Sequence, residues 1–199
     1  MVWNSPSIIF YHRDIKVVAV SDVSGGLYKK SGLDITDISD YLETKGNLLK
    51  DYNAPGVEHI TNEELLTCEC DVLIPAALEN QITAEVAEKV KCSYIIEAAN
   101  GPTSEAGDVV LENRGIPVIP DIFANCGGVI VSYFEWVQNI QELTWSRERV
   151  NEMLADLMSK AFMDILSVKK ECDCTFRMAA YIVALRKLVY AEEIKGIFP

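Results

Sequence analysis

The chain has 199 residues, of which 49% are hydrophobic, so it is long enough and apolar enough to bury one core. Its 30 acidic and 18 basic residues give a formal net charge of −12, which disfavours nucleic acid and anionic membranes as partners. Apolar runs such as Asp71–Leu78 are shorter than the roughly 20 residues that span a bilayer. Composition therefore predicts a soluble protein. Six cysteines without framework spacing, and no secretory signal, favour reduced thiols in an intracellular compartment.

The cysteines are spaced too closely for a common zinc motif. Cys68 and Cys70, and again Cys172 and Cys174, are separated by one residue, whereas zinc sites typically use two to four intervening residues. The chain has only 2 histidines to complete such a site. We therefore expect buried thiols and no metal.

The first part of the chain predicts one strand and two helices. Residues 1–14 have no clear period, although Ser7–His12 is apolar and aromatic enough for a short strand. Lys16–Asp22 is a β-branched run typical of a strand buried on both faces of a parallel sheet. A loop through Gly25–Tyr28 is expected next, then a helix over Thr36–Thr44. A second, short helix begins at Thr61, because a glutamate stands three residues later at capping-box spacing.

The middle of the chain alternates strands with helices. Apolar runs centred on Val72, Ile95 and Val118 are each followed by a helical pattern. This alternation predicts an α/β fold with a parallel sheet. Ligands bind outside the carboxyl ends of the strands in such sheets, so the loops after these three strands are the candidate site.

The segment Pro117–Asn139 predicts a strand, a turn and a helix capped by Asn125. Gly127 and Gly128 fall in the first helical turn, where each costs about 1 kcal/mol relative to alanine. Val129 and Ser132 share one face just beyond them. Two interpretations are equally open. A ligand lies against the bare backbone with the hydroxyl orienting it, or the glycines permit helix packing and Ser132 bonds back to Gly128.

Two long helices are predicted at the end of the chain, over Arg147–Glu171 and Thr175–Lys195. Both carry apolar residues at helical spacing, which we expect to face the core. In the first these are Val150, Leu154, Leu157, Met158, Ala161, Phe162, Ile165 and Leu166, and in the second Met178, Ile182, Leu185 and Val189.

Four segments in order resemble the glutamate dehydrogenase family. They are Pro75–Thr83 (PAALENQIT), Glu97–Thr103 (EAANGPT), Asn125–Trp136 (NCGGVIVSYFEW) and Arg177–Tyr181 (RMAAY), with Cys126 where the family usually has alanine. The resemblance runs from about Lys16 to Gly196 and covers the carboxyl-terminal, cofactor-binding half. It implies an unmatched segment 1–14, a truncated NAD(P)-binding domain 15–145, and a helical pair 146–199 of the same domain.

The resemblance implies a Rossmann-like parallel sheet with helices on both faces, lacking the first strand and its glycine-rich turn. No glycine precedes Asp22, so the usual phosphate-binding fingerprint is absent from this sequence. Family members catalyse the reversible oxidative deamination of L-glutamate to 2-oxoglutarate and ammonia with NAD or NADP. The full-length family forms homo-oligomers.

The resemblance also assigns site residues. Asp22 bonds the adenosine ribose, unless it is simply a turn-former; Asn80 is likewise either a cofactor contact or a helix-entry residue. The cofactor-binding set is Asp22, Ala76, Ala77, Asn80, Asn100 and Asn125, and the substrate-binding set is Val129 and Ser132. An acid at position 22 favours NAD by repelling a 2′-phosphate, whereas Lys29 and Lys30 oppose this preference.

No catalytic residue is predicted in this chain, because the family's catalytic lysine and aspartate belong to the amino-terminal half. We therefore expect a glutamate dehydrogenase segment that is inactive alone. The alternative is a non-catalytic subunit that assembles with full-length homologues. One face of the two long helices is expected to lack its partner surface and to expose an apolar patch. The sequence leaves cytoplasm and mitochondrion equally open.

Overall fold

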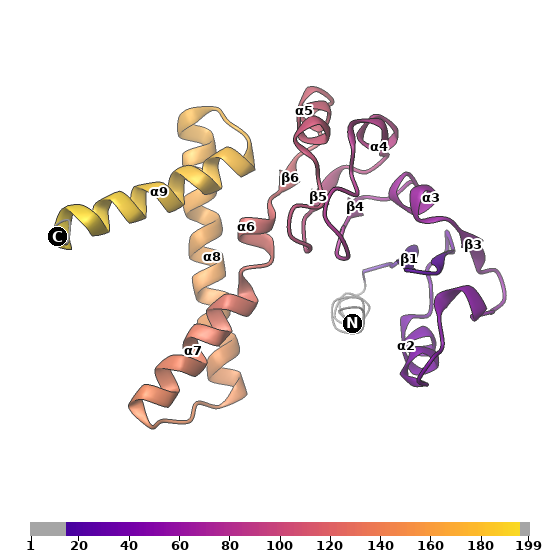
Figure 1. The fold of residues 1–199 in the computed structure, drawn as a ribbon, viewed down its shortest axis with the longest axis horizontal. Helices are drawn as coiled ribbons and strands as arrows, with labels where there is room; N and C mark the ends of the chain where they lie inside the picture. The colour runs from indigo at the N-terminus through magenta and orange to yellow at the C-terminus, as the bar shows by residue number, and fades with distance from the viewer. Residues whose placement is uncertain (1–14, 196–199) are drawn as a thin grey trace.

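A computed structural model of the chain describes residues 15–195 (Figure 1). The elements follow one another across an elongated molecule: a first sheet with α2 at one end, a second sheet with α4 and α5 in the middle, and α7, α8 and α9 at the other end. The predicted strand Ser7–His12 lies outside the described residues.

The first sheet contains β1 (Ala19–Asp22), β2 (Gly25–Tyr28) and β3 (Glu58–Ile60), in that order and antiparallel throughout. Strands β1 and β2 form a hairpin in which Asp22 pairs with Gly25. Gly26 permits close strand contact, because a Cβ there would lie 3.1 Å from the Ile60 side chain.

Two predictions fail in this sheet. Lys16–Asp22 was expected in a parallel sheet, yet the part that forms a strand, Ala19–Asp22, pairs among the described residues with β2 alone, and this pairing is antiparallel. Gly25–Tyr28 was expected to be a loop and is a strand. Gly25 and Gly26 in isolation indicate a turn. Here they belong to a strand, because the next residue, Leu27, is completely buried.

Helix α2 (Ile35–Glu43), the 3₁₀ helix η1 (Leu49–Asp51) and α3 (Asn62–Leu66) accompany the first sheet. The predictions of a helix near Thr36–Thr44 and of a capping box at Thr61 are confirmed. The core of this part is Val20, Leu27, Leu33, Ile35, Ile38, Leu49 and Tyr52.

The second sheet contains β4 (Val72–Leu73), β5 (Tyr94–Ile96) and β6 (Val118–Ile119), all parallel. Helices α4 (Ala84–Lys89) and α5 (Glu105–Asn113) pack side by side (Figure 1). The predicted parallel α/β arrangement is confirmed. Val72 is exposed, because β4 is an edge strand of this sheet.

The core of this second unit is formed by Leu73, Ile82, Ala87, Val90, Cys92, Ile95 and Leu111. Gly107 of α5 is part of this packing. A Cβ at that position would collide with the carbonyl oxygen of Ile82. The absence of a side chain therefore lets α5 approach the loop that precedes α4.

Four helices complete the described part of the chain: α6 (Asp121–Ala124), α7 (Gly127–Gln141), α8 (Arg147–Cys172) and α9 (Phe176–Lys195). The expectation that Asn125 caps the long helix is wrong. Asn125 ends α6, its N–H bonding to the Asp121 carbonyl, and α7 begins after Cys126. The side chain of Asn125 is thereby released for a contact outside the helix.

The two predicted terminal helices are confirmed as α8 and α9. Ile165, Val168, Ala179 and Ala180 form a third core cluster where they cross. The expectation that both apolar stripes face the core is wrong for four members, since Leu157, Met178, Leu185 and Val189 are exposed. The expected exposed apolar patch is confirmed on α9, where Met178, Tyr181, Leu185 and Leu188 form what we call the α9 apolar face.

Candidate cofactor and substrate site

The loops that follow β4 and β5 are joined by backbone hydrogen bonds. The N–H groups of Ala98 and Ala99 donate to the Pro75 carbonyl at 3.1 and 3.0 Å. Ala76 and Ala77, which follow Pro75, therefore lie beside the Glu97–Gly101 loop at the carboxyl edge of the parallel sheet. Small side chains leave backbone accessible here, as a ligand crossing the edge requires.

Three predicted asparagines come together at the same edge. Asn80 has a left-handed backbone with φ of 53°, and its N–H donates to the Gly101 carbonyl at 2.8 Å. The Nδ2 of Asn125 donates to the Oδ1 of Asn100 at 2.6 Å. Two loops thus bring the side-chain amides of Asn100 and Asn125 together, and the backbone of Asn80 lies beside them, although the asparagines are 20 residues or more apart in sequence. Each amide offers both donors and acceptors, the pattern that matches a ligand carboxamide.

The beginning of α7 presents bare backbone to open space. A Cβ at Gly128 would meet no other atom within 4 Å, and one at Gly127 would lie 3.9 Å from Leu154 Cδ1, an ordinary contact. Close packing within the described residues therefore does not explain Gly128. Val129 is 73% exposed and Ser132 is also exposed, so the face predicted for the substrate is accessible.

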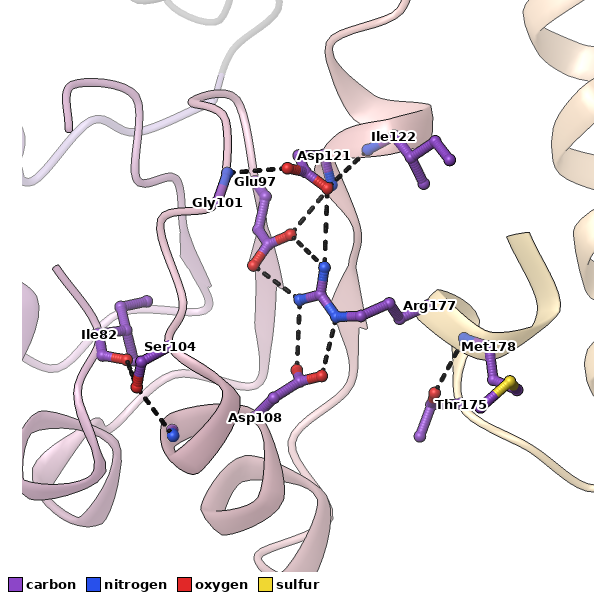
Figure 2. A network of polar contacts seen from close by, with 11 residues as sticks. Ile82, Glu97, Gly101, Ser104, Asp108, Asp121, Ile122, Thr175, Arg177 and Met178 are labelled. Atoms are coloured by element: carbon purple, nitrogen blue, oxygen red, sulfur yellow. Dashed lines mark hydrogen bonds and ion pairs between the residues drawn. The ribbon is translucent and has the colours of Figure 1, made fainter. Parts of the chain in front are cut away.

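Beneath this edge lies a group of charges that the sequence did not reveal (Figure 2). Arg177, near the start of α9, donates two hydrogen bonds to Glu97 at 3.0 and 2.8 Å and two to Asp108 at 2.8 and 3.2 Å. Its Nη1 also lies 3.6 Å from Asp121 Oδ1. We call these four residues the Arg177 clamp. It ties α9 to the end of β5, to α5 and to the start of α6.

The clamp is partly enclosed, and the side chain of Glu97 is completely buried. Burial alone lowers the pKa of Arg177, but hydrogen bonds and charges from Glu97 and Asp108 outweigh it and raise the pKa above its ordinary range. Arg177 is therefore always charged. The signals available in the sequence were an acid closing the apolar run Ser93–Ile96 and an arginine opening a family motif. Neither signal identifies its partner.

Asp22 lies at the end of β1, in the antiparallel sheet, and its carboxylate serves the local structure. Oδ1 accepts from the Ser24 N–H and hydroxyl at 2.7 and 2.5 Å, and Oδ2 accepts from the Leu49 N–H at 3.0 Å. Burial raises its pKa, but the hydrogen bonds from Leu49 and Ser24 outweigh this and lower it. Asp22 therefore stays ionised, and its predicted role towards a ribose stays a prediction.

A cavity of about 280 Å³ lies at the amino end of β6. Pro117, Val118 and the connection Asp173–Phe176 line it, together with Asp108 and Arg177 of the clamp. Since the candidate residues gather at the carboxyl ends of the strands, this cavity is not the site described here. Across residues 15–195, no three or more His, Cys, Asp or Glu side chains are grouped to hold a metal ion. No helix in that range is both long and apolar enough to cross a membrane.

Parallel strands followed by polar and glycine-rich loops at their carboxyl edge define a Rossmann-like α/β domain. A family model, Glutamate/Leucine/Phenylalanine/Valine dehydrogenase, matches residues 7–196. The chain belongs to this family of dehydrogenases.

Relatives of known activity match nearly the whole chain. Glutamate dehydrogenase A2 of Halobacterium salinarum is 47% identical over 188 residues, which are 94% of this chain and 44% of that protein. An NAD-specific glutamate dehydrogenase of Bacillus subtilis is 45% identical over 91% of this chain and 42% of its own. An NADP-specific glutamate dehydrogenase of Synechocystis is 45% identical over 94% of this chain and 45% of its own. The family thus uses a nicotinamide cofactor in both forms.

Solved structures agree with the fold. The hetero-hexameric glutamate dehydrogenase of Thermus thermophilus, in its leucine-bound form, superposes with a TM-score of 0.89 at 27% identity. The match covers 100% of this chain and 46% of that one. The chain therefore spans less than half the length of the relatives that it matches.

Proposed function

We propose that this chain forms the cofactor-binding part of a glutamate dehydrogenase, which converts L-glutamate reversibly to 2-oxoglutarate and ammonia. The observation that carries the proposal is the meeting of Asn80, Asn100 and Asn125 at the carboxyl edge. Family membership supports the class of reaction, and the names of the relatives support glutamate as the amino acid.

The predicted residues other than Asp22 have the following roles at this edge. The asparagine amides receive the carboxamide of NAD or NADP, while Ala76 and Ala77 leave room for the adjoining ribose. The bound nicotinamide supplies the hydride chemistry. Val129 packs against the aliphatic part of glutamate, and the Ser132 hydroxyl donates to its side-chain carboxylate.

We favour NAD over NADP because Asp22 is held ionised by its neighbours. A 2′-phosphate close to this carboxylate would be repelled by its negative charge. Replacing Asp22 with serine should therefore improve NADPH affinity relative to NADH affinity.

The proton transfers of deamination require further groups. At the carboxyl edge, the acids Glu97 and Asp121 are already engaged by Arg177 and by backbone N–H groups. They are poor candidates for a general base, which must be free to accept a substrate proton. We therefore propose that the chain binds ligands but needs a complementary protein portion for turnover.

Binding and turnover are separable by experiment. NADH fluorescence titration of the 199-residue chain should show saturable binding, weakened by Asn100→Ala and by Asn125→Ala. Glutamate-dependent NAD reduction should be absent for the chain alone. It should appear when the chain is co-expressed with the unmatched portion of the Halobacterium relative, and Ser132→Ala should then raise the KM for glutamate. Absence of NADH binding at millimolar concentration would rule out the proposal.

A second candidate is a non-catalytic subunit that assembles with full-length homologues. The α9 apolar face favours it, because Leu185 and Leu188 are 58% and 63% exposed and a soluble protein rarely leaves such a stripe uncovered. Co-expression with a tagged full-length homologue should then yield a mixed oligomer by size-exclusion chromatography. Elution of the two proteins in separate peaks would exclude this candidate.

A further inference from the structure

The Arg177 clamp is connected to the asparagine pair by a short chain of hydrogen bonds. Glu97 Oε2 accepts from the Asp121 N–H at 3.0 Å, and Asp121 Oδ2 accepts from the Gly101 N–H at 2.8 Å (Figure 2). Gly101 directly follows Asn100, which is bonded to Asn125. The guanidinium therefore acts on the loop that carries one amide and, through Asp121, on the helix that precedes the other.

The arrangement of these hydrogen bonds depends on Arg177. The fully buried Glu97 side chain accepts from the Asp121 N–H with Oε2, the same oxygen that accepts from Arg177 Nη1. Removing one partner of such a buried pair disturbs the groups that remain. A planar guanidinium can serve Glu97 and Asp108 bidentately at once, whereas an ammonium group cannot. Arg177 thus fixes the direction in which the oxygens of Glu97 point.

We propose that Arg177 is a positioning residue for the nicotinamide end of the cofactor site, acting through Glu97 and Asp121 to hold Asn100 and Asn125 in register. This inference rests on the proposed function, since it assigns the asparagine pair to the cofactor. In this role Arg177 acts through its carboxylate partners and not by contact with cofactor or substrate. Its motif at 177–181 is then a support for the site and not a part of it.

A second ion pair on α9 provides a matched control. Arg186 donates to both oxygens of Glu171 at 2.9 and 3.0 Å, a bidentate pair like that of Arg177 with Glu97. It joins α9 to α8 on the exposed surface and has no connection to the carboxyl edge. A purely structural role for Arg177 would make the two arginines differ only in stability.

The first test needs no ligand. In the 199-residue chain, the side-chain amide NMR signals of Asn125 should shift or broaden in Arg177→Lys. This variant keeps the positive charge but loses the planar group that binds two carboxylates bidentately. They should remain in place in Arg186→Lys. Unchanged Asn125 signals in Arg177→Lys would overturn the positioning role, whatever the protein binds.

The second test compares NADH with ADP-ribose, which lacks the nicotinamide. Arg177→Lys should weaken NADH binding about fivefold to tenfold, the loss expected when one good hydrogen bond is misplaced, and leave ADP-ribose binding nearly unchanged. Equal weakening of both ligands would overturn the positioning role and leave the proposed function standing. Failure of the wild-type chain to bind either ligand would instead overturn the proposed function.

A further variant keeps both tests decisive if Arg177→Lys does not fold. Asp121→Ala leaves the Arg177–Glu97 pair in place but removes the acceptor of the Gly101 N–H. It should reproduce the Asn125 shift and the selective loss of NADH affinity. Asp108→Asn weakens the clamp on the side of α5, away from this connection, and should lower stability alone.

Discussion

Replacing Gly128 with alanine separates the two interpretations of the paired glycines. The added Cβ would meet no atom within 4 Å, so the protein itself has room for it. Alanine is favoured over glycine in a helix by about 1 kcal/mol, with a smaller gain expected in the first turn. The free energy of unfolding should therefore rise by roughly 0.5–1 kcal/mol, which raises the Tm by about 2 °C in a chain of this size.

The same methyl group should harm ligand binding if a ligand lies against this backbone. Forcing one extra carbon into a filled contact costs about 1–3 kcal/mol, which corresponds to roughly 5- to 150-fold weaker binding. Gly128→Ala should thus be more stable than the wild-type chain and bind NADH, or NADH with 2-oxoglutarate, less tightly. The two effects have opposite signs, so misfolding cannot imitate them.

Gly127→Ala is the matched control for this prediction. It makes a similar change in helix propensity one residue earlier, but its Cβ faces Leu154 Cδ1 at 3.9 Å and not the open side. Circular dichroism melting and NADH fluorescence titration measure both variants. Should Gly128→Ala gain stability and keep wild-type affinity, no ligand approaches this backbone and the site has been placed wrongly.

Three further outcomes follow from the structure. Gly107→Ala should destabilise the chain by roughly 1–3 kcal/mol in urea unfolding, because the new Cβ collides with the Ile82 carbonyl and backbone must move. Asp22→Asn should have a lower free energy of unfolding than the wild-type chain. This difference should be fully present above the ordinary pKa of 3.8, and it should shrink as the pH falls through the lowered pKa of Asp22 in the folded chain. The double variant Leu185→Lys, Leu188→Lys should reduce self-association in light scattering while changing the unfolding free energy by less than about 0.5 kcal/mol, since both side chains are exposed.

The sequence predicts those parts of the fold that depend on local pattern. The capping box at Thr61 and the alternation of strands and helices after Val72 follow from spacing alone, and both are confirmed. The antiparallel strand at Gly25–Tyr28 was missed because its evidence is the burial of Leu27, which depends on tertiary packing. Asn125 was misassigned because a cap preference cannot foresee that a short helix precedes the long one.

Prediction of the site was limited in a similar way. Motifs identified Asn80, Asn100 and Asn125 separately, and the structure adds that they share one edge. The Arg177 clamp was not foreseen, since its ion pairs join residues up to 80 positions apart in the chain. Pairing over such a distance leaves no periodic trace in a single sequence.

Residues 15–195 contain three separate hydrophobic clusters, one for each part of the elongated molecule. Cooperative melting requires that the parts lose their structure together, and here a polar contact, the Arg177 clamp, is one of the links between the second and the third cluster. Calorimetry should consequently give a van't Hoff enthalpy smaller than the measured heat. The helical end should melt independently of the sheets once that polar contact is broken.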